Sequence, residues 1–200
     1  MHISSEKRAF QIFRENGGVL RTSEILRFGI HPRTLYQLRD TSQVIELSRG
    51  VFRLSDLPAL ENSDLVTISK RVPAGVICLI SALQFHGITD EIPHEVYLAI
   101  QKGKEKPKVD YPPARVFHFS TGTYAAGFEE HDLDGTKVKV YSKEKTIADC
   151  FKFRNKIGLD VALNGLRQCL VTGGSIPEIL KFARLCRVEN VIRPYLEAIQ

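Results

Sequence analysis

The sequence contains no hydrophobic run long enough to cross a membrane. Its most apolar stretch, residues 72–83, includes Pro73 and falls short of the ~20 residues that a spanning helix requires. The N-terminus lacks the apolar core of a secretory signal. These absences predict a cytoplasmic protein that does not have a membrane as its partner.

Cysteine is sparse and follows no metal-binding pattern. Cys78, Cys150, Cys169 and Cys186 show no CxxC spacing and lie inside apolar helical patterns. Such positions favour buried free thiols over disulfides or metal ligands, in keeping with a reducing compartment.

Signatures of several enzyme classes are missing too. The chain has no GxxxxGK[ST] phosphate loop and no HExxH motif, and no Asp or Glu stands two residues before a Lys, as a restriction-type nuclease core would need. His131 lies beside Glu129, Glu130 and Asp132, but this spacing fits a solvated acidic hairpin better than a metal site. We therefore expect a protein that is not an enzyme and that binds no cofactor and no metal.

The composition is that of an ordinary globular protein. Of the 200 residues, 43% are hydrophobic and 26% are charged, which gives a net charge of +5. Residues 1–57 are relatively more basic, with nine Lys and Arg against six Asp and Glu. A charge of this size agrees with a nucleic-acid partner without requiring one.

The pattern of apolar residues predicts an α+β protein with two domains, residues 1–57 and 63–200. The stretch LSDLPALENSD, which contains Pro58, is typical of a linker between them. The second domain is predicted to hold helices at 64–71 and 75–85, strands at 95–100 and 115–120, and a hairpin of 129–133 with 137–141 around Asp134-Gly135. From Ser142 onward the pattern is helical, and SIPE at 175–178 matches a capping box.

Residues 1–57 show the pattern of a winged helix-turn-helix. An amphipathic helix is predicted over 5–15, followed by a short helix over 23–28 with Thr22 as its N-cap. The next helix begins near Pro32 and ends near Asp40. Val44 to Leu47 and Val51 to Leu54 then form a hairpin whose loop places Arg49 at the tip of the wing.

The chemistry of these elements favours DNA as a ligand. Leu35 and Leu38 are predicted to face the core, so that Arg33 and Gln37 point outward, where they can pair with guanine and adenine in the major groove. The expected DNA-binding residues are Arg21, Thr22, Ser23, Arg33, Thr34, Tyr36, Gln37, Arg49 and Arg53. The alternative is a winged-helix module that docks onto a protein partner.

Two further groups of charged residues have open interpretations. The lysines of QKGKEKPK form either a second phosphate-contacting loop or an ordinary solvated charge run; they are Lys102, Lys104, Lys106 and Lys108. Lys145 and Asp149 lie one helical turn apart, which favours an exposed ion pair on a helix surface over a surface that faces a toxin.

Both halves of the chain resemble the AbiEi-type antitoxins of abortive-infection toxin-antitoxin systems, known as type IV antitoxins. The N-terminal resemblance lies in PRTLYQLRD and VIELSRGVFRL, and the C-terminal resemblance lies in ICLISALQFHGITDEIPHEVYLAI and VYSKEKTIADCFKFRNKIGLDVAL. The segment DTSQ at 40–43 departs from the family, which commonly has a glycine between the recognition helix and the wing.

This resemblance implies an antitoxin that binds inverted repeats of double-stranded DNA in its own promoter and represses its own transcription. The C-terminal domain would counteract a cognate nucleotidyltransferase-like toxin, directly or indirectly. The family's DNA-reading positions fall on Arg33, Thr34, Tyr36, Gln37 and Arg49. Inverted repeats imply two copies on neighbouring half-sites. The alternative is a transcription regulator unrelated to a toxin.

Overall fold

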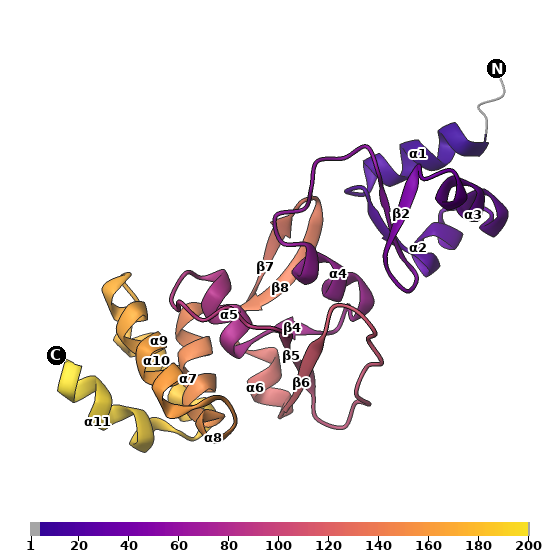
Figure 1. Ribbon diagram of the computed structural model, residues 1–200. Coiled ribbons are helices and arrows are strands. Elements are labelled where there is room, and N and C mark those ends of the chain that lie inside the picture. The colour runs from indigo at the N-terminus through magenta and orange to yellow at the C-terminus, as the bar shows by residue number, and fades with distance from the viewer. Residues whose placement is uncertain (1–4, 200) are drawn as a thin grey trace. The chain divides into compact units, whose positions relative to one another are not determined.

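The computed structural model describes residues 5–199, so residues 1–4 and 200 of the two predicted domains lie outside the described part. The protein is a mixed α+β structure with two sheets (Figure 1). The helices are α1 (Ser5–Glu15), α2 (Thr22–Arg27), α3 (Pro32–Asp40), α4 (Ser63–Arg71), α5 (Leu79–Phe85), α6 (Thr121–Ala125), α7 (Lys143–Lys152), α8 (Arg154–Ile157), α9 (Leu159–Val171), α10 (Ile176–Cys186) and α11 (Glu189–Ile199). The strands are β1 (Val19–Arg21), β2 (Val44–Ser48), β3 (Val51–Leu54), β4 (Val76–Ile77), β5 (Val96–Gln101), β6 (Ala114–Phe119), β7 (Phe128–Leu133) and β8 (Thr136–Tyr141). In the described range no helix has the length and apolar character that crossing a membrane demands.

The chain divides into two compact units. Unit 1 comprises residues up to Pro73, Pro107–Pro113 and His131–Val138, and unit 2 comprises Ala74–Lys106, Ala114–Glu130 and the chain from Lys139 onward. Unit 1 thus extends beyond the segment 1–57 in which the sequence pattern places the DNA-binding elements. It includes α4 and two segments that come much later in the chain.

The first part of unit 1 contains the helices α1, α2 and α3 and a small antiparallel sheet. The sheet has the strand order β1-β3-β2, so β3 is its central strand. Its core contains Phe13 of α1, Ile25 of α2, and Leu35 and Leu38 of α3, all buried. The helices over 5–15 and 32–40 and the hairpin agree with the sequence prediction, whereas β1 is not predicted. Gly50 has a φ of +75° in the hairpin turn, which explains why glycine stands there.

The end of α3 is closed by a Schellman motif. The amide of Gln43 donates to the carbonyl of Leu38 at 2.9 Å, and that of Ser42 donates to the carbonyl of Arg39 at 2.9 Å. Ser42 adopts the left-handed conformation, with a φ of +58°, that glycine adopts most easily. The motif therefore forms without the glycine that is common in the family.

The second sheet has five strands in the order β6-β5-β4-β8-β7. The β4–β5 pair is antiparallel, and the β5–β6 and β4–β8 pairs are parallel. The turn at Asp134-Gly135 has φ values of 51° and 75°, as a type I′ hairpin turn requires.

The predicted helix over 75–85 is wrong at its beginning. Val76 and Ile77 form strand β4, and the helix starts only at Leu79. The residues from Val76 to Leu83 are all buried. An apolar run that is buried on every side has no periodicity to distinguish a strand from a helix.

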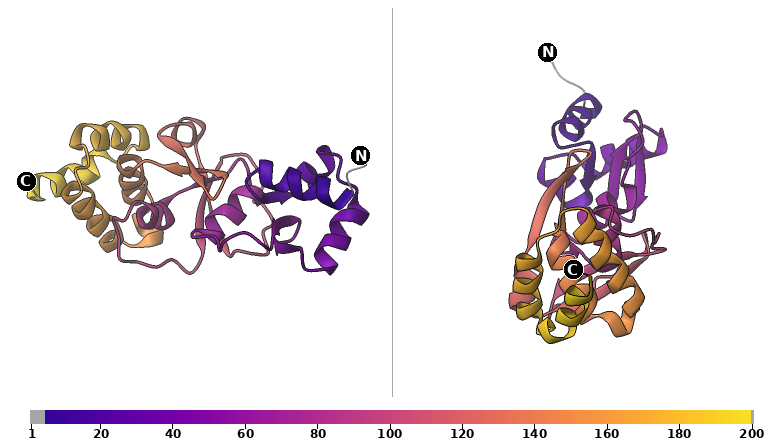
Figure 2. Two further views of the ribbon diagram at one scale, coloured as in Figure 1. Left: turned by 90° about the horizontal axis from the view of Figure 1, so that it is seen from above. Right: turned by 90° about the vertical axis from the view of Figure 1, so that its left-hand side faces the viewer.

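The C-terminal part of unit 2 is a cluster of helices in which α7 packs against α5, α9, α10 and α11. These helices lie together in both views of Figure 2. The predicted cap at 175–178 forms in part, because the Ser175 hydroxyl accepts from the Glu178 amide at 3.4 Å. The carboxylate that accepts from the Ser175 amide comes from Glu144 of α7, at 3.2 Å.

Candidate nucleic-acid interface

The outward face of α3 is polar and exposed. Pro32 stands in its first turn, and His31 caps it because its Nδ1 accepts from the Arg33 amide at 3.1 Å. Arg33, Tyr36 and Gln37 are exposed, and Tyr36 retains 47% of its surface. They line a shallow hollow together with Asp40 and Thr41. A helix face with this geometry can present donors and acceptors to base edges.

Two side chains on this face already have partners. The Gln37 amide nitrogen donates to a carboxylate oxygen of Glu6 in α1 at 2.8 Å. The Tyr36 ring lies under the guanidinium of Arg39, 4.9 Å from the ring centroid. Arg33, in contrast, has no hydrogen bond or ion pair from its side chain to any described residue. A ligand can therefore engage Arg33 without breaking a contact that the structure describes.

The β2–β3 hairpin carries Arg49 in its turn. Arg49 is exposed, and its guanidinium has no partner among the residues that the structure describes. The carboxylate of Glu46 accepts from the Gly50 amide at 2.8 Å and stabilises the turn. The hairpin therefore presents a free cation on a fixed loop.

The beginning of α2 differs from the prediction. Thr22 is not the N-cap: its amide and hydroxyl both donate to the Gly50 carbonyl, at 2.9 and 3.3 Å. The N-cap is Arg21, whose amide donates to Glu24 at 3.0 Å. Thr22 therefore holds α2 to the hairpin turn instead of offering a free amide, whereas Ser23 is exposed. Thr34 is half-buried on the side of α3.

Arg53 is buried, which contradicts its prediction as a DNA contact. It is 6% exposed, and its guanidinium donates to the Pro58 carbonyl. The reason is the unpredicted strand β1, which makes β3 central, together with the segment that carries Pro58. All four residues of β3 are buried, so the alternation of an edge strand does not apply.

The four lysines of the predicted second phosphate loop do not form one group. All are exposed, but Lys102, Lys104 and Lys106 belong to unit 2, whereas Lys108 belongs to unit 1. Arg71 of α4, which the sequence reasoning did not single out, donates to the Lys108 carbonyl at 3.0 Å. No run of charges in the sequence indicates that contact.

The prediction of an exposed ion pair at Lys145 and Asp149 is wrong. Both side chains are 0% exposed, and Lys145 Nζ lies 2.5 Å from Asp149 Oδ2. The ammonium also lies 4.3 Å from the centroid of the Tyr141 ring. Because the pair is enclosed, it offers no surface to a toxin, and the alternative role predicted for it is excluded in this structure.

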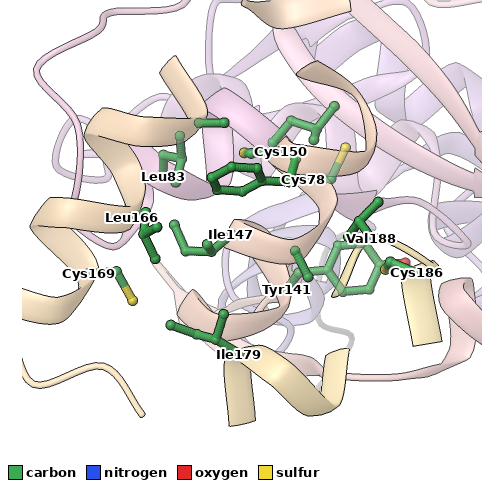
Figure 3. Packing of buried hydrophobic residues seen from close by; sticks show 14 of the residues in the cluster. Cys78, Leu83, Tyr141, Ile147, Cys150, Leu166, Cys169, Ile179, Cys186 and Val188 are labelled. Atoms are coloured by element: carbon green, nitrogen blue, oxygen red, sulfur yellow. The ribbon is translucent and has the colours of Figure 1, made fainter. Parts of the chain in front are cut away.

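Tyr141 and Cys186, which contact this ion pair, belong to the buried hydrophobic cluster of unit 2 that Figure 3 shows. Burial raises the pKa of Asp149 above its usual range, and the charge of Lys145 opposes the shift. The Cys186 thiol donates to Asp149 at 3.3 Å, and burial, with a smaller contribution from Asp149, raises the pKa of this thiol to about 12. Cys78 and Cys150 lie in the same cluster, and all four cysteines are free and buried, as predicted.

Among residues 5–199 no group of three His, Cys, Asp or Glu side chains could hold a metal ion. The fold is similar to that of the RV2827C protein from Mycobacterium tuberculosis, with a TM-score of 0.60 and 13% identity over 90% of this chain and 72% of that chain. No curated protein sequence matches.

A family model matches the N-terminal part of the chain. It is described as "Transcriptional regulator, AbiEi antitoxin" and covers residues 7–55, which include α2, α3 and the β2–β3 hairpin. The matched region contains PRTLYQLRD and VIELSRGVFRL, on which the N-terminal resemblance depends. The family model thus confirms the resemblance to the AbiEi-type antitoxins over residues 7–55.

Proposed function

We propose that this protein is an operator-binding antitoxin. In this proposal α2, α3 and the β2–β3 hairpin form a winged helix-turn-helix that binds inverted repeats in the protein's own promoter. The observation that carries the proposal is the exposed polar face of α3, with Arg33 unpaired, beside a hairpin that presents the free cation of Arg49. The family match over residues 7–55 supports the same assignment.

Each exposed side chain has a role that its chemistry allows. With α3 in the major groove, Arg33 would donate two hydrogen bonds to a guanine, and Gln37 would pair with an adenine once it leaves Glu6. Tyr36 would donate its hydroxyl to a phosphate, and Arg49 would contact a phosphate or the minor groove. The exposed Ser23 would donate its hydroxyl to the sugar-phosphate backbone of the DNA. Two copies on neighbouring half-sites would match an inverted repeat.

A gel-shift titration of the full chain tests the DNA half. The probe is the DNA immediately upstream of the gene, and the competitor is unrelated DNA of the same length, over a series of salt concentrations. We expect specific retardation that weakens steeply as salt rises, because counterions are released on binding. Absence of binding at low salt would overturn the proposal in favour of a winged-helix module that docks onto a protein.

Arg33→Ala should relax or abolish the preference for the upstream DNA. Loss of a bidentate contact costs about 1–3 kcal/mol of discrimination, which is roughly 5- to 150-fold. Arg167→Ala is the matched control, because Arg167 is an exposed arginine of α9 in unit 2 with no described partner. Equal losses in both variants would contradict the assignment of α3 as the reading helix.

Glu6→Gln tests whether the Glu6–Gln37 contact opposes DNA binding. The substitution removes a negative charge next to the reading face, so that we expect tighter binding, with the largest gain at low salt, where the repulsion between Glu6 and the phosphates is least screened. Gln37→Ala should reduce the discrimination between base pairs at one position of the operator. Weaker binding by Glu6→Gln would show that the carboxylate supports the bound conformation instead.

The antitoxin half of the proposal assigns the rest of the chain to a cognate nucleotidyltransferase-like toxin. It is supported by the family description and by the resemblance of the KEKTIAD segment. Expression of the neighbouring gene alone and together with this chain is the test, with bacterial growth as the readout. We expect toxicity that this chain relieves. A neighbouring gene that is harmless by itself would favour a regulator unrelated to a toxin.

A further inference from the structure

A hollow of about 200 Å³ lies in unit 1 beside the hairpin turn. It is lined by the start of α2, the hairpin turn and the end of α4, through Arg21, Thr22, Ser23, Gly50, Val51, Lys70 and Arg71. This volume is several times the ~30 Å³ that a water molecule occupies in the liquid, so a phosphate group fits. The lining holds three cations and no carboxylate.

Arg71, which lines this hollow, joins the hairpin turn to the segment 107–113. Its Nη1 donates to the Arg49 carbonyl at 2.6 Å, and its Nη2 donates to the Lys108 carbonyl at 3.0 Å. Because the guanidinium fork is planar and rigid, these two backbone segments are held side by side. The Ser48 hydroxyl, which donates to the Tyr111 carbonyl at 2.6 Å, is a second tie between the hairpin and the segment 107–113. The backbones of Arg49 and Lys108 therefore lie next to Arg71, which is itself part of the lining of the hollow.

The charge around the hollow is poorly compensated. Glu24 is the one described carboxylate within ion-pair distance of any of the five cations, Arg21, Arg49, Lys70, Arg71 and Lys108. Its Oε2 lies 4.0 Å from Arg21 Nε and 3.6 Å from Lys70 Nζ. The Arg21 side chain is 38% exposed, and its guanidinium makes no hydrogen bond with a described residue. An anion with several acceptor oxygens would satisfy these donors.

We propose that Arg21, Lys70 and Lys108 bind a backbone phosphate of double-stranded DNA next to the contact made by the hairpin. The inference rests on the proposed DNA-binding function and extends it to α4 and the segment 107–113, which lie outside the matched residues 7–55. Arg71 is a positioning residue, since both of its terminal nitrogens are engaged with backbone carbonyls. The contact supplies affinity without reading sequence, because a phosphate carries no base identity.

The test uses Lys70→Gln and Lys108→Gln in the full chain, with upstream DNA and unrelated DNA of equal length over a salt series. Each variant should lower the slope of log K against log salt by about 0.9, the value for one lost phosphate contact. The affinity for both DNAs should fall by the same factor. Arg167→Gln, which removes one exposed charge from unit 2, should leave the slope unchanged.

The outcomes separate this inference from the proposed function. If the unmodified chain does not bind DNA, the proposed function fails and the inference fails with it. If it binds and both lysine variants behave as Arg167→Gln does, only the inference fails. A loss confined to the upstream DNA would also overturn it, because that result indicates base reading. Because Lys70 is paired with Glu24, thermal unfolding is used to check that Lys70→Gln folds. If it does not fold, Lys108→Gln alone tests the inference, since Lys108 is exposed.

Discussion

Single residues in this protein show where a charge pattern is misleading. Lys145 and Asp149 have the spacing of a solvent-exposed ion pair, and Arg53 has the position of an outward-facing residue in an edge strand. All three are buried. Spacing along one element determines which side chains are neighbours, but burial depends on the elements that pack around it. Here those elements are the helices around α7 and the strand β1 beside β3.

Removal of one charge from the buried pair should destabilise the protein strongly. Lys145→Met leaves Asp149 enclosed without its counter-ion, which costs about 3–5 kcal/mol of unfolding free energy at neutral pH. The loss should shrink as the pH falls, because a folded-state pKa above the unfolded value favours the folded state where Asp149 takes up a proton. Urea unfolding at several pH values measures this dependence.

The double variant Lys145→Met/Asp149→Leu is the control for this prediction. An apolar pair of similar volume often replaces a buried ion pair at little cost, so that the double variant should be more stable than Lys145→Met alone. A Lys145→Met variant that unfolds within 1 kcal/mol of the unmodified protein would contradict the structural role given to the pair.

At the scale of elements, local signals predicted most of the structure. The helix α3 follows from Pro32 at its start and the spacing of Leu35 and Leu38, and the β7–β8 hairpin follows from Asp134-Gly135. Strands β1 and β4 could not be predicted in this way. Each has two or three residues, and each exists because neighbouring strands supply its hydrogen bonds, a long-range contact that no local pattern encodes.

The Schellman motif at the end of α3 offers a stabilising substitution. Ser42 adopts a left-handed conformation at the C′ position, which costs free energy for any residue other than glycine. Ser42→Gly should raise the unfolding free energy by about 0.5–1 kcal/mol, the left-handed penalty less the greater entropy loss of glycine. Thr41→Gly is the control: Thr41 has a φ of −89° and its hydroxyl donates to the Gln37 carbonyl at 2.9 Å, so this change should destabilise. Equal effects of the two substitutions would exclude the explanation from backbone conformation.

At the scale of the molecule, the part of the candidate interface that lies in one continuous segment of the chain could be predicted from the sequence. The residues of α3 and Arg49 lie within 18 consecutive positions, 32–49, and the structure leaves Arg33, Tyr36, Gln37 and Arg49 exposed. Arg71 could not be found from the sequence, because its hydrogen bonds to the hairpin turn and to the segment 107–113 span 22 and 37 positions. Lys70 could not be found either, because its partner Glu24 lies in another helix, far from it in the sequence. Long-range hydrogen bonds of Arg71 and Ser48 join the segment 107–113, which carries Lys108, to the hairpin.

Because all four cysteines lie in unit 2, their reactivity reports on the unfolding of that unit alone. Cys78, Cys150, Cys169 and Cys186 all belong to unit 2, and burial raises the pKa of each thiol. Since the thiolate is the reactive form, an aromatic disulfide reagent at pH 8 should modify none of them in the native protein and all four after denaturation. In a urea series the appearance of reactive thiols should follow the unfolding of unit 2 even where DNA binding is lost earlier. A thiol that reacts stoichiometrically before any unfolding would contradict the packing of this core.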